Sequence, residues 1–251
     1  MTDFAAIPSD HRTYMPIATP PPVHLTGVVS TTQVAGKTVR FLVANPRDDV
    51  QGFHYRGFFY EQGVMGAFAT YFKPGQVFLD IGANVGNHSI YAEMFLGAGA
   101  VIPMECNPDA IAILRVNALL NGLARTDLSH LGLALSDTEA SHGISAPRDN
   151  LGMATLQADP EGSIRSVTGD SLFADRQIDF IKLDVEGMEI AVLRGLERTI
   201  SRNRPTLFIE VDHVNRPAFD EWMTDHDYTT LGHTKPSDKN QNFVIGPRPA
   251  A

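Results

Sequence analysis

Two carboxylates follow neighbouring apolar segments at positions where a small molecule could bind. Asp80 lies in the apolar run 77–82, directly before a turn that contains Gly82 and Gly86. Glu105 ends the next apolar run, 100–105. An acidic residue about 20 positions beyond a glycine-rich turn commonly accepts hydrogen bonds from ribose hydroxyls. A carboxylate at Asp80 would repel a pyrophosphate but attract an ammonium group.

The glycine turn itself does not match a dinucleotide site. The fingerprint G-x-G-x-x-G, aligned on Gly82, needs glycine where the chain has Asn84 and Asn87. A ligand with a ribose and an ammonium group but no phosphate is S-adenosylmethionine, and its positive charge suits an acidic pocket. The alternative is that Asp80 caps a helix and Glu105 is a solvated strand end; two carboxylates flanking one glycine turn favour the cofactor.

Three further groups complete the predicted cofactor site. Cys106 and Asn107 follow Glu105 directly and are expected to flank the adenine ring. Ser136 and Asp137 end the third apolar run, 128–135, where a side chain can bond the adenine amino group. Ser-Asp is equally common at the start of a turn.

Acidic groups and a histidine end the last two predicted parallel strands, 179–185 and 206–211. Strand alternation puts Lys182 and Asp184 on one face, where burial is costly unless they pair or bind a ligand. The candidate catalytic residues at these two strand ends are Asp184, Glu186, Glu210 and His213.

These groups could remove a proton from an acceptor hydroxyl. His213 has the unperturbed pKa of a general base. Asp184 or Glu210 could act instead, or bind a divalent metal that acidifies the hydroxyl. The structural alternatives are a surface His213 and a Lys182–Asp184 ion pair without a catalytic role.

The elements that position these residues alternate between strand and helix. Five short apolar runs alternate with amphipathic segments, which predicts a parallel sheet covered by helices on both faces. In the tail, a helix over 216–227 precedes two strands, 228–234 and 242–246, joined by a short turn and therefore antiparallel. The polar segment 138–165 is expected to be a mobile loop beside the site.

The first 73 residues are predicted to form an N-terminal extension. Residues 1 to about 25 are Pro-rich and read as an irregular arm. A strand, a turn at Ala35–Gly36 and a second strand follow, and then a helical segment that stops at Lys73–Pro74. The predicted division is therefore an extension over 1–73 and a main domain over 74–251.

The composition of the chain limits the classes of partner that it is expected to bind. The chain has 251 residues and a net charge of −9, without a clustered basic stripe, which argues against nucleic acid. The single Cys106 excludes an intrachain disulfide. Neither a secretory signal nor an apolar run of membrane-spanning length is present, so a soluble cytoplasmic protein is expected. The oligomeric state is left open, with a homodimer as one option.

The motifs over residues 58–211 resemble those of the FkbM family of S-adenosylmethionine-dependent methyltransferases. The segments that carry the resemblance are "FFYEQG", "KPGQVFLDIGANVGNHSIYAE", "VIPMECNPDAIAILRVNALLNG", "LALSD", "DFIKLDVEGMEIAVLRG" and "RPTLFIEV". The resemblance implies a Rossmann-like α/β fold with a seven-stranded, mostly parallel sheet whose last strand is antiparallel.

The resemblance also implies roles for individual residues. Asp80, Gly82, Asn84 and Gly86 would hold the methionine end of the cofactor, and Glu105 its ribose. The adenine would lie near Ser136 and Asp137, and the reaction centre near Asp184 and Glu186. Glu61 would close over the cofactor from the extension, and Asn150 would lie in an acceptor-side loop.

The sequence thus predicts O-methylation of a small hydroxylated acceptor, such as a sugar or a polyketide. Three alternatives stay open. Lys182, Asp184 and Glu210 echo the Lys-Asp-Lys-Glu set of ribose 2′-hydroxyl RNA methyltransferases, although the chain is acidic. A nicotinamide oxidoreductase shares the sheet but not the glycines. A cofactor-binding protein without catalysis is the third, because fold does not establish chemistry.

Overall fold

A computed structural model describes residues 25–147, 149–234 and 239–249. The Pro-rich arm expected at the N-terminus lies outside the described residues up to position 24. Over the described residues, no helix combines the length and the hydropathy that a bilayer span requires.

The main sheet has six strands in the order β11-β12-β10-β9-β3-β4. β3, β4, β9 and β10 are mutually parallel, and β12 runs antiparallel to both of its neighbours. The predicted mixed sheet with an antiparallel tail strand is confirmed. The bounds are β3 Val77–Ile81, β4 Ala100–Met104, β9 Phe180–Leu183, β10 Thr206–Asp212, β11 Tyr228–Thr234 and β12 Asn240–Pro247.

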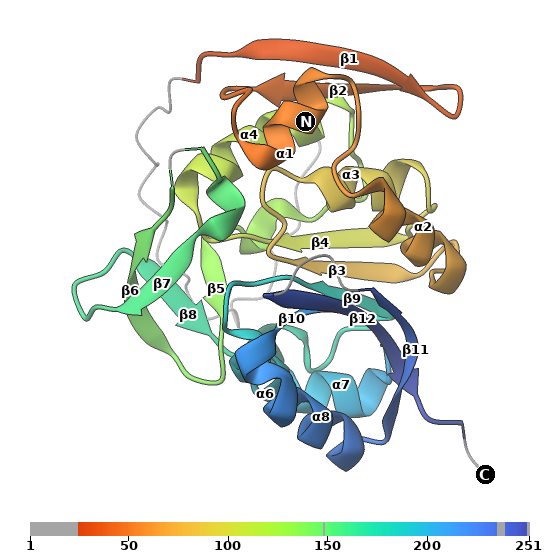
Figure 1. Ribbon diagram of the computed structural model, residues 1–251, viewed down its shortest axis with the longest axis vertical. Helices are drawn as coiled ribbons and strands as arrows, with labels where there is room; N and C mark the ends of the chain where they lie inside the picture. Colours follow the sequence, from red (N-terminus) through yellow and green to blue (C-terminus); the bar gives the residue numbers. More distant parts are fainter. Residues whose placement is uncertain (1–24, 148, 235–238, 250–251) are drawn as a thin grey trace, which may run out of the picture.

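Helices cover both faces of this sheet, as the alternation predicts (Figure 1). On one face lie α2 (Gln62–Tyr71), α3 (Asn87–Met94) and α4 (Pro108–Leu120). On the other lie α5 (Gly169–Phe173), α6 (Glu189–Gly195), α7 (Glu197–Asn203) and α8 (Arg216–Asp225). Two short helices, α6 and α7, follow β9 in direct succession, and Gly195 ends α6 where a Cβ would lie 2.0 Å from the carbonyl oxygen of Ser136.

Alternation along the strands separates an apolar face from one that becomes polar at its end. Leu79, Ile181 and Leu207 point into the core under α6, α7 and α8. Phe78, Phe180 and Phe208 form an aromatic layer on the opposite face with Phe68 of α2. Two residues further along these strands, that second face carries Asp80, Lys182 and Glu210. The aromatic layer therefore forms the base on which the polar site is built.

The predicted third strand, 128–135, is mostly not a strand of the main sheet. Asp127 caps a short 3₁₀-helix, Leu128–His130, by accepting the N–H of Ser129, so that only β5 (Leu133–Leu135) is extended. β5 pairs with β8 rather than with β4. One bond, from the N–H of Gly132 to the carbonyl of Glu105 (2.8 Å), ties it to the end of β4. The expected seven-stranded sheet is thus six strands plus this neighbour.

The polar segment 138–165 is also structured, contrary to expectation. It forms β6 (Ala140–Ser145), β7 (Thr155–Ala158) and the start of β8 (Ile164–Val167), which join β5 in a second sheet ordered β5-β8-β6-β7. Ser166 is fully buried and accepts the N–H of Ala140 through its hydroxyl. A polar sequence can form strands here because antiparallel pairing of β6 with β7 and β8 satisfies its backbone, and the Ser166 hydroxyl adds one bond. The connection between β6 and β7 lies beside the site and contains a short 3₁₀ turn, Leu151–Met153.

The N-terminal extension packs on the helical layer above the sheet. β1 (Val28–Val34) and β2 (Lys37–Val43) form the predicted hairpin, with Ala35 and Gly36 at positive φ in its turn. It lies over α4 in Figure 1, where the side chain of Asn117 accepts the N–H of Leu42 at 2.7 Å. A short helix, α1 (Asp49–Tyr55), then leads towards α2. The extension thus adds a further layer above α3 and α4.

Candidate active site

Two hollows meet at the carboxyl edge of the parallel strands. The first lies over β3, β4 and β5 and encloses about 710 Å³ of empty space, its open mouth included. The second lies over β3, β9 and β10 and encloses about 1090 Å³ on the same basis. The residues that line both hollows are Gly82, Asn84, Gly152, Asp184 and Glu186.

The turn after β3 is shaped by a close approach of two backbones. Gly82 has φ +77, and a Cβ there would lie 1.9 Å from the carbonyl oxygen of Asp184. No larger residue fits this contact. Gly86 has φ +88 at the start of α3, against Leu114 of α4. The two glycines let the turn lie flat at the strand end, so that Asn84 borders both hollows.

Glu105 binds the same turn from the neighbouring strand. Its carboxylate accepts the backbone N–H groups of Asn84, Cys106 and Asn107, each at 2.8 Å. Burial raises the pKa of Glu105, and these hydrogen bonds act in the opposite direction. The side chain lines the first hollow and is partly exposed there. Glu105 therefore fixes the turn while its carboxylate borders the cavity.

The rest of the first hollow is mostly apolar. Burial raises the pKa of the Cys106 thiol to about 12, which makes it a neutral wall residue. The hollow has carboxylates at one side and an apolar slot at the other, as a ligand with a polar end and a flat ring requires. The apolar residues lining it are Met104, Leu133, Leu135, Leu151, Leu156, Val185 and Met188.

A buried ammonium group lies beneath the junction of the two hollows. Lys182 Nζ donates to the carbonyl of Gly82 at 2.7 Å and lies 3.1 Å from Asp184 and 3.6 Å from Asp80. Burial lowers the pKa of Lys182, but the carboxylates of Asp184 and Asp80 together outweigh it, so the pKa is raised. Lys182 is thus a fixed positive charge that holds the glycine turn against β9.

Asp80 lies below the hollows and lines neither of them. It is fully buried and accepts the hydroxyl of Ser89 at 2.6 Å. Strand alternation explains this: Asp80 is one residue before the end of β3, on the face that α3 covers. Its position makes it the partner of Lys182 rather than a group facing a ligand.

Two carboxyl groups in the second hollow have strongly raised pKa values. Burial, followed by the negative charge of Asp184, raises the pKa of Glu210 to about 8. The same causes raise the pKa of Glu61 to about 7. Glu210 accepts a hydrogen bond from the Asn240 side chain, and Glu61 lies 3.5 Å from His88 Nε2. Near neutral pH these groups exchange protons readily, which suits acid–base chemistry.

The histidine at this site is His88, not the predicted His213. His88 is 5% exposed and lines the second hollow, and burial lowers its pKa well below the usual value, so the ring is neutral. His213 lies in a 3₁₀ turn after β10, with its side chain 62% exposed and 3.0 Å from Asp212. It lines neither hollow. The turn directs its side chain outwards.

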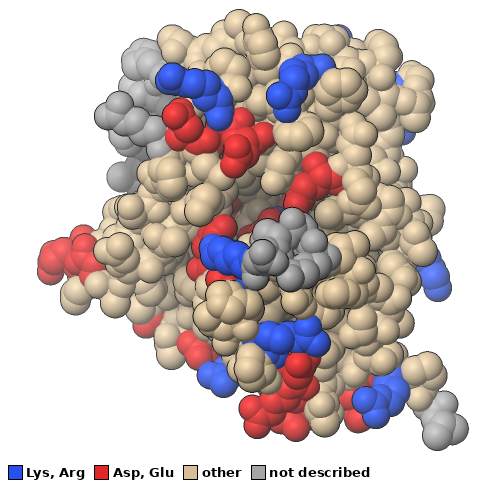
Figure 2. Space-filling model, viewed as in Figure 1, with Lys and Arg blue, Asp and Glu red and all other residues tan. Residues whose placement is uncertain are grey.

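Segments from outside the central sheet close the second hollow. The side chain of Asn150 donates to Asp49 of α1 at 2.6 Å, and the N–H of Leu151 donates to Asp48 at 2.8 Å. These bonds hold the loop 149–153 against the extension. Across the opening, Lys239 donates to Glu186 at 2.8 Å. Figure 2 shows carboxylates around this opening, with a basic side chain at its rim.

The structure brings together most of the predicted residues. The predicted residues that line a hollow are Glu61, Gly82, Asn84, Glu105, Cys106, Asn150, Asp184, Glu186 and Glu210. Those that line neither are Asp80, Gly86, Asn107, Ser136, Asp137 and His213. Asn107 caps α4 by accepting the N–H of Asp109. Ser136 follows β5 directly and is buried, with its carbonyl against Gly195 of α6; the next residue, Asp137, is exposed.

Sequence reasoning missed several lining residues: Asp49, Tyr60, Asn87, His88, Lys239 and Asn240. Asn87 and His88 open the helix after the glycine turn, and first-turn residues at this edge face the site, so position alone could have found them. The other four lie in segments outside the strand–helix alternation, where the sequence carries no such signal.

A divalent metal is not supported by the donor arrangement. Among the residues that the structure describes, no three His, Cys, Asp or Glu side chains are placed together to hold a metal ion. Asp184 is engaged by Lys182 instead.

Comparison with known proteins agrees with this geometry. The family described as the methyltransferase FkbM domain matches residues 80–229, more than half of the chain. The chain belongs to the FkbM methyltransferase family. It is accordingly an S-adenosylmethionine-dependent methyltransferase, as its motifs predict.

Two relatives of this FkbM methyltransferase show the range of similarity. Hexuronic acid methyltransferase AglP of Haloferax volcanii is 26% identical over 174 residues, which are 67% of this chain and 68% of AglP. The crystal structure of an FkbM methyltransferase from Methylobacillus flagellatus is 20% identical, with a TM-score of 0.51. That alignment covers 78% of this chain and about half, 52%, of the solved one. The structural likeness supports the fold alone.

The first hollow has the groups that S-adenosylmethionine needs. Glu105 borders it with a carboxylate that could accept hydrogen bonds from ribose hydroxyls, and its apolar slot could hold an adenine ring. The Oδ1 atom of Asn84 is buried without a hydrogen-bond partner among the described residues, an open acceptor for an ammonium group. Asp184 and Glu186, where the hollows meet, supply negative charge for the sulfonium and ammonium. The residues present thus fit the cofactor.

Proposed function

We propose that this FkbM-family enzyme methylates a hydroxyl group of a small, sugar-like acceptor. The observation that carries the proposal is Glu210, a carboxyl group with its pKa raised to about 8, in a hollow that adjoins the cofactor site. An alcohol must lose a proton as its oxygen is methylated, and a base with a pKa near the working pH removes it most effectively. The cofactor, when bound, supplies the electrophilic methyl group.

Different residues of the chain bind the donor, bind the acceptor and remove the proton. Glu105, Asn84 and the apolar slot bind the donor in the first hollow, and the second hollow binds the acceptor. In its deprotonated form Glu210 accepts the hydroxyl proton, and Asn240 orients its carboxylate by a hydrogen bond. Glu61 and the neutral His88 lie on the facing side and hydrogen-bond to the acceptor.

A carboxylate base is favoured over a lysine. A lysine acts as a base only when neutral, whereas the raised pKa of Lys182 keeps its ammonium protonated. Lys182 is also engaged with Gly82 and Asp184. This arrangement supports a small-molecule enzyme over the ribose 2′-hydroxyl RNA methyltransferases that the Lys-Asp-Glu set echoes, in accord with the net charge of −9.

The acceptor is proposed to be a sugar because AglP, a relative, carries the name of a hexuronic acid methyltransferase. The second hollow is lined by polar groups able to exchange hydrogen bonds with several hydroxyls, as sugar sites are. Tyr60, Asn87 and Asn150 add donors and acceptors to its carboxyl groups.

The test is transfer of a radiolabelled methyl group from S-adenosylmethionine to a panel of simple glycosides, followed by mass spectrometry of the product. O-methylation is expected, with the label lost when Glu210 is replaced by Gln. Labelling of an amine in preference to a hydroxyl would contradict O-specificity. Cofactor binding without transfer to any glycoside, polyketide or extract component would contradict catalysis.

A further inference from the structure

A third hollow extends the acceptor side of the site along α2. It is a groove between α2 and the outer strands β11 and β12, with about 1220 Å³ of empty space, its mouth included. Tyr71, at the end of α2, donates to the carbonyl of Leu231 in β11 at 2.9 Å and closes its far end. We name it the α2 groove; it is lined by Glu61, Gly63, Val64, Ala67, Thr70, Tyr71, Phe208, Gly232, His233, Thr234, Asn242 and Val244.

The floor of the α2 groove continues the floor of the active site. In the strand register, Glu210 of β10 is opposite Asn242 of β12, which is opposite Thr234 of β11. Glu210 lines the second hollow, while Asn242 and Thr234 line the groove. Glu61 lines both. A molecule with its reacting hydroxyl at Glu210 therefore reaches the groove by crossing one strand.

The groove differs chemically from the acidic hollow that it adjoins. Its middle part is apolar, with Val64 and Ala67 of α2 facing Phe208 and Val244 of the sheet. Among the described residues that line it, Glu61 is the one acidic residue, at the end next to the active site. Covering apolar surface of this kind with an apolar group of a ligand makes the free energy of binding more favourable.

One polar atom in the groove lacks a partner. Asn242 is 3% exposed, and its Oδ1 has no hydrogen-bond partner among the described residues. A buried acceptor left unsatisfied is costly, so such a group in a native protein needs an explanation, and a ligand that donates to it supplies one. Asn242 lies beside Glu210, so a ligand N–H or O–H meets it on leaving the acidic hollow.

We propose that the α2 groove binds an apolar substituent of the methyl acceptor, an alkyl or aryl group attached to the sugar. The substituent lies against Val64, Ala67, Phe208 and Val244, and Asn242 accepts a hydrogen bond from a hydroxyl or amide at its attachment point. The acceptor class is then a glycoside with a lipophilic aglycone rather than a free sugar. This inference rests on the proposed function for the position of the reacting hydroxyl.

Gly232 offers a way to block the groove without touching the acidic hollow. A Cβ at this position would lie 3.4 Å from the Tyr71 hydroxyl and 3.8 Å from Val244, and its φ lies outside the left-handed region. Gly232→Leu therefore fills the groove without backbone strain. Gly66 of α2 provides a matched control, because it is exposed and a Cβ there meets no atom within 4 Å.

The experiment compares methyl and octyl glycosides of the same sugar as acceptors. Wild-type enzyme and Gly66→Leu are expected to show a KM at least about tenfold lower for the octyl glycoside, the effect of covering two or more methylene groups. Gly232→Leu is expected to lose this difference while keeping its KM for the methyl glycoside. Equal KM values for the two glycosides in the wild type would overturn the proposal.

A binding measurement separates failure of the groove from failure of the proposed function. Saturation-transfer NMR is recorded with octyl glucoside, below its micelle concentration, and S-adenosylhomocysteine. Saturation of the octyl protons by the wild type but not by Gly232→Leu supports the groove even if no glycoside is methylated. Absence of octyl saturation in the wild type, or saturation that Gly232→Leu leaves unchanged, overturns it whatever the activity.

Discussion

Asp80 and Lys182 lie directly opposite each other on β3 and β9, with Nζ 3.6 Å from Oδ1, and both are almost wholly buried. Lys182→Met would leave the Asp80 carboxyl buried without its partner, so we expect a loss of about 3 kcal/mol in unfolding free energy, measured by urea denaturation. Arg165→Met, which breaks the exposed pair with Glu139, should cost about 0–1 kcal/mol.

The double variant Asp80→Asn/Lys182→Met gives a sharper control, because it removes both charges. It should recover part of the stability that Lys182→Met loses. Equal stability of Lys182→Met and the wild type would mean that the pair does not hold the strand ends together.

Glu105→Gln should weaken cofactor binding. The carboxylate accepts three backbone N–H groups around the turn, and an amide would set its own NH₂ against one of them. Losing a charge-assisted hydrogen bond typically costs 1.5–3 kcal/mol, so S-adenosylhomocysteine should bind about 10- to 100-fold more weakly in calorimetry.

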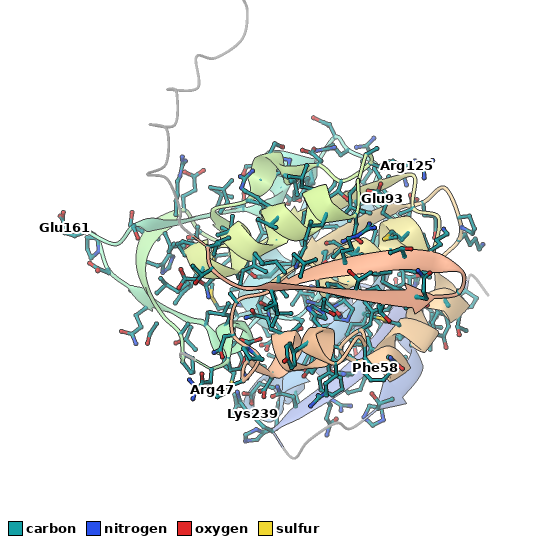
Figure 3. All side chains as sticks on the ribbon, turned by 90° about the horizontal axis from the view of Figure 1, so that it is seen from above. Arg47, Phe58, Glu93, Arg125, Glu161 and Lys239 are labelled. Atoms are coloured by element: carbon teal, nitrogen blue, oxygen red, sulfur yellow. The ribbon has the colours of Figure 1, made fainter. Side chains whose placement is uncertain are left out.

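Glu93→Gln is the matched control for this variant. Glu93 also accepts backbone N–H groups, from Ala124 and Arg125, but lines neither hollow. Figure 3 shows Glu93 and Arg125 on the side of the molecule away from Lys239, which lines the second hollow. Unchanged affinity in Glu105→Gln, or an equal loss in Glu93→Gln, would remove Glu105 from the cofactor site.

Activity should rise with pH through about 8. The deprotonated carboxylate of Glu210 is the base, and its pKa is raised to about 8, so the protonated, inactive form predominates below that pH. Glu210→Gln should lower kcat by at least about 100-fold, the usual contribution of a general base. The exposed Glu197→Gln should keep the wild-type profile. A wild-type rate independent of pH between 6 and 9 would exclude this role.

The same group links stability to pH. Its pKa is raised from 4.5 to about 8 in the folded chain, so between these values the folded state holds a proton that the unfolded state has lost. Stability contributed by protonated Glu210 is therefore present below about pH 4.5 and declines as pH rises towards 8. Thermal unfolding of Glu210→Gln should show a weaker decline over that range.

Neutral acceptors should be preferred to anionic ones. Among the described residues that line the second hollow, Asp49, Asp184, Glu186, Glu61 and Glu210 are acidic, against two lysines that are both paired with carboxylates. Like charges placed together cost several kcal/mol, so a glucoside should have a kcat/KM at least about tenfold above that of the matching glucuronide. The ratio should grow with pH as Glu61 and Glu210 ionise. A preference for the glucuronide would contradict this charge assignment.

The alternation of strands and helices could be predicted from the sequence because buried parallel strands are continuously apolar. The turns between them could also be predicted, because they depend on residues close together in the chain. For that reason Gly82, Glu105 and Asp184 could be placed at this edge of the sheet from the sequence, where they line the hollows. Asp80 was predicted to face the ligand because the sequence shows that it lies near the end of a strand. The sequence does not show that α3 covers the face on which its side chain lies. The strands in 138–165 were missed because they are mostly polar and partly exposed and are held by backbone pairing with one another, so they carry no hydrophobic period.

The family match covers residues 80–229, yet several residues that line the second hollow lie outside it: Asp49 and Val50 of α1, Tyr60 and Glu61 before α2, and Lys239 and Asn240. Every residue that lines the first hollow thus lies within the matched domain, whereas part of the wall of the second hollow is supplied by flanking segments. Exchanging those flanking segments between relatives should change the choice of acceptor and leave the cofactor site unchanged. Trimming the chain to residues 80–229 would leave the cofactor site open on one side.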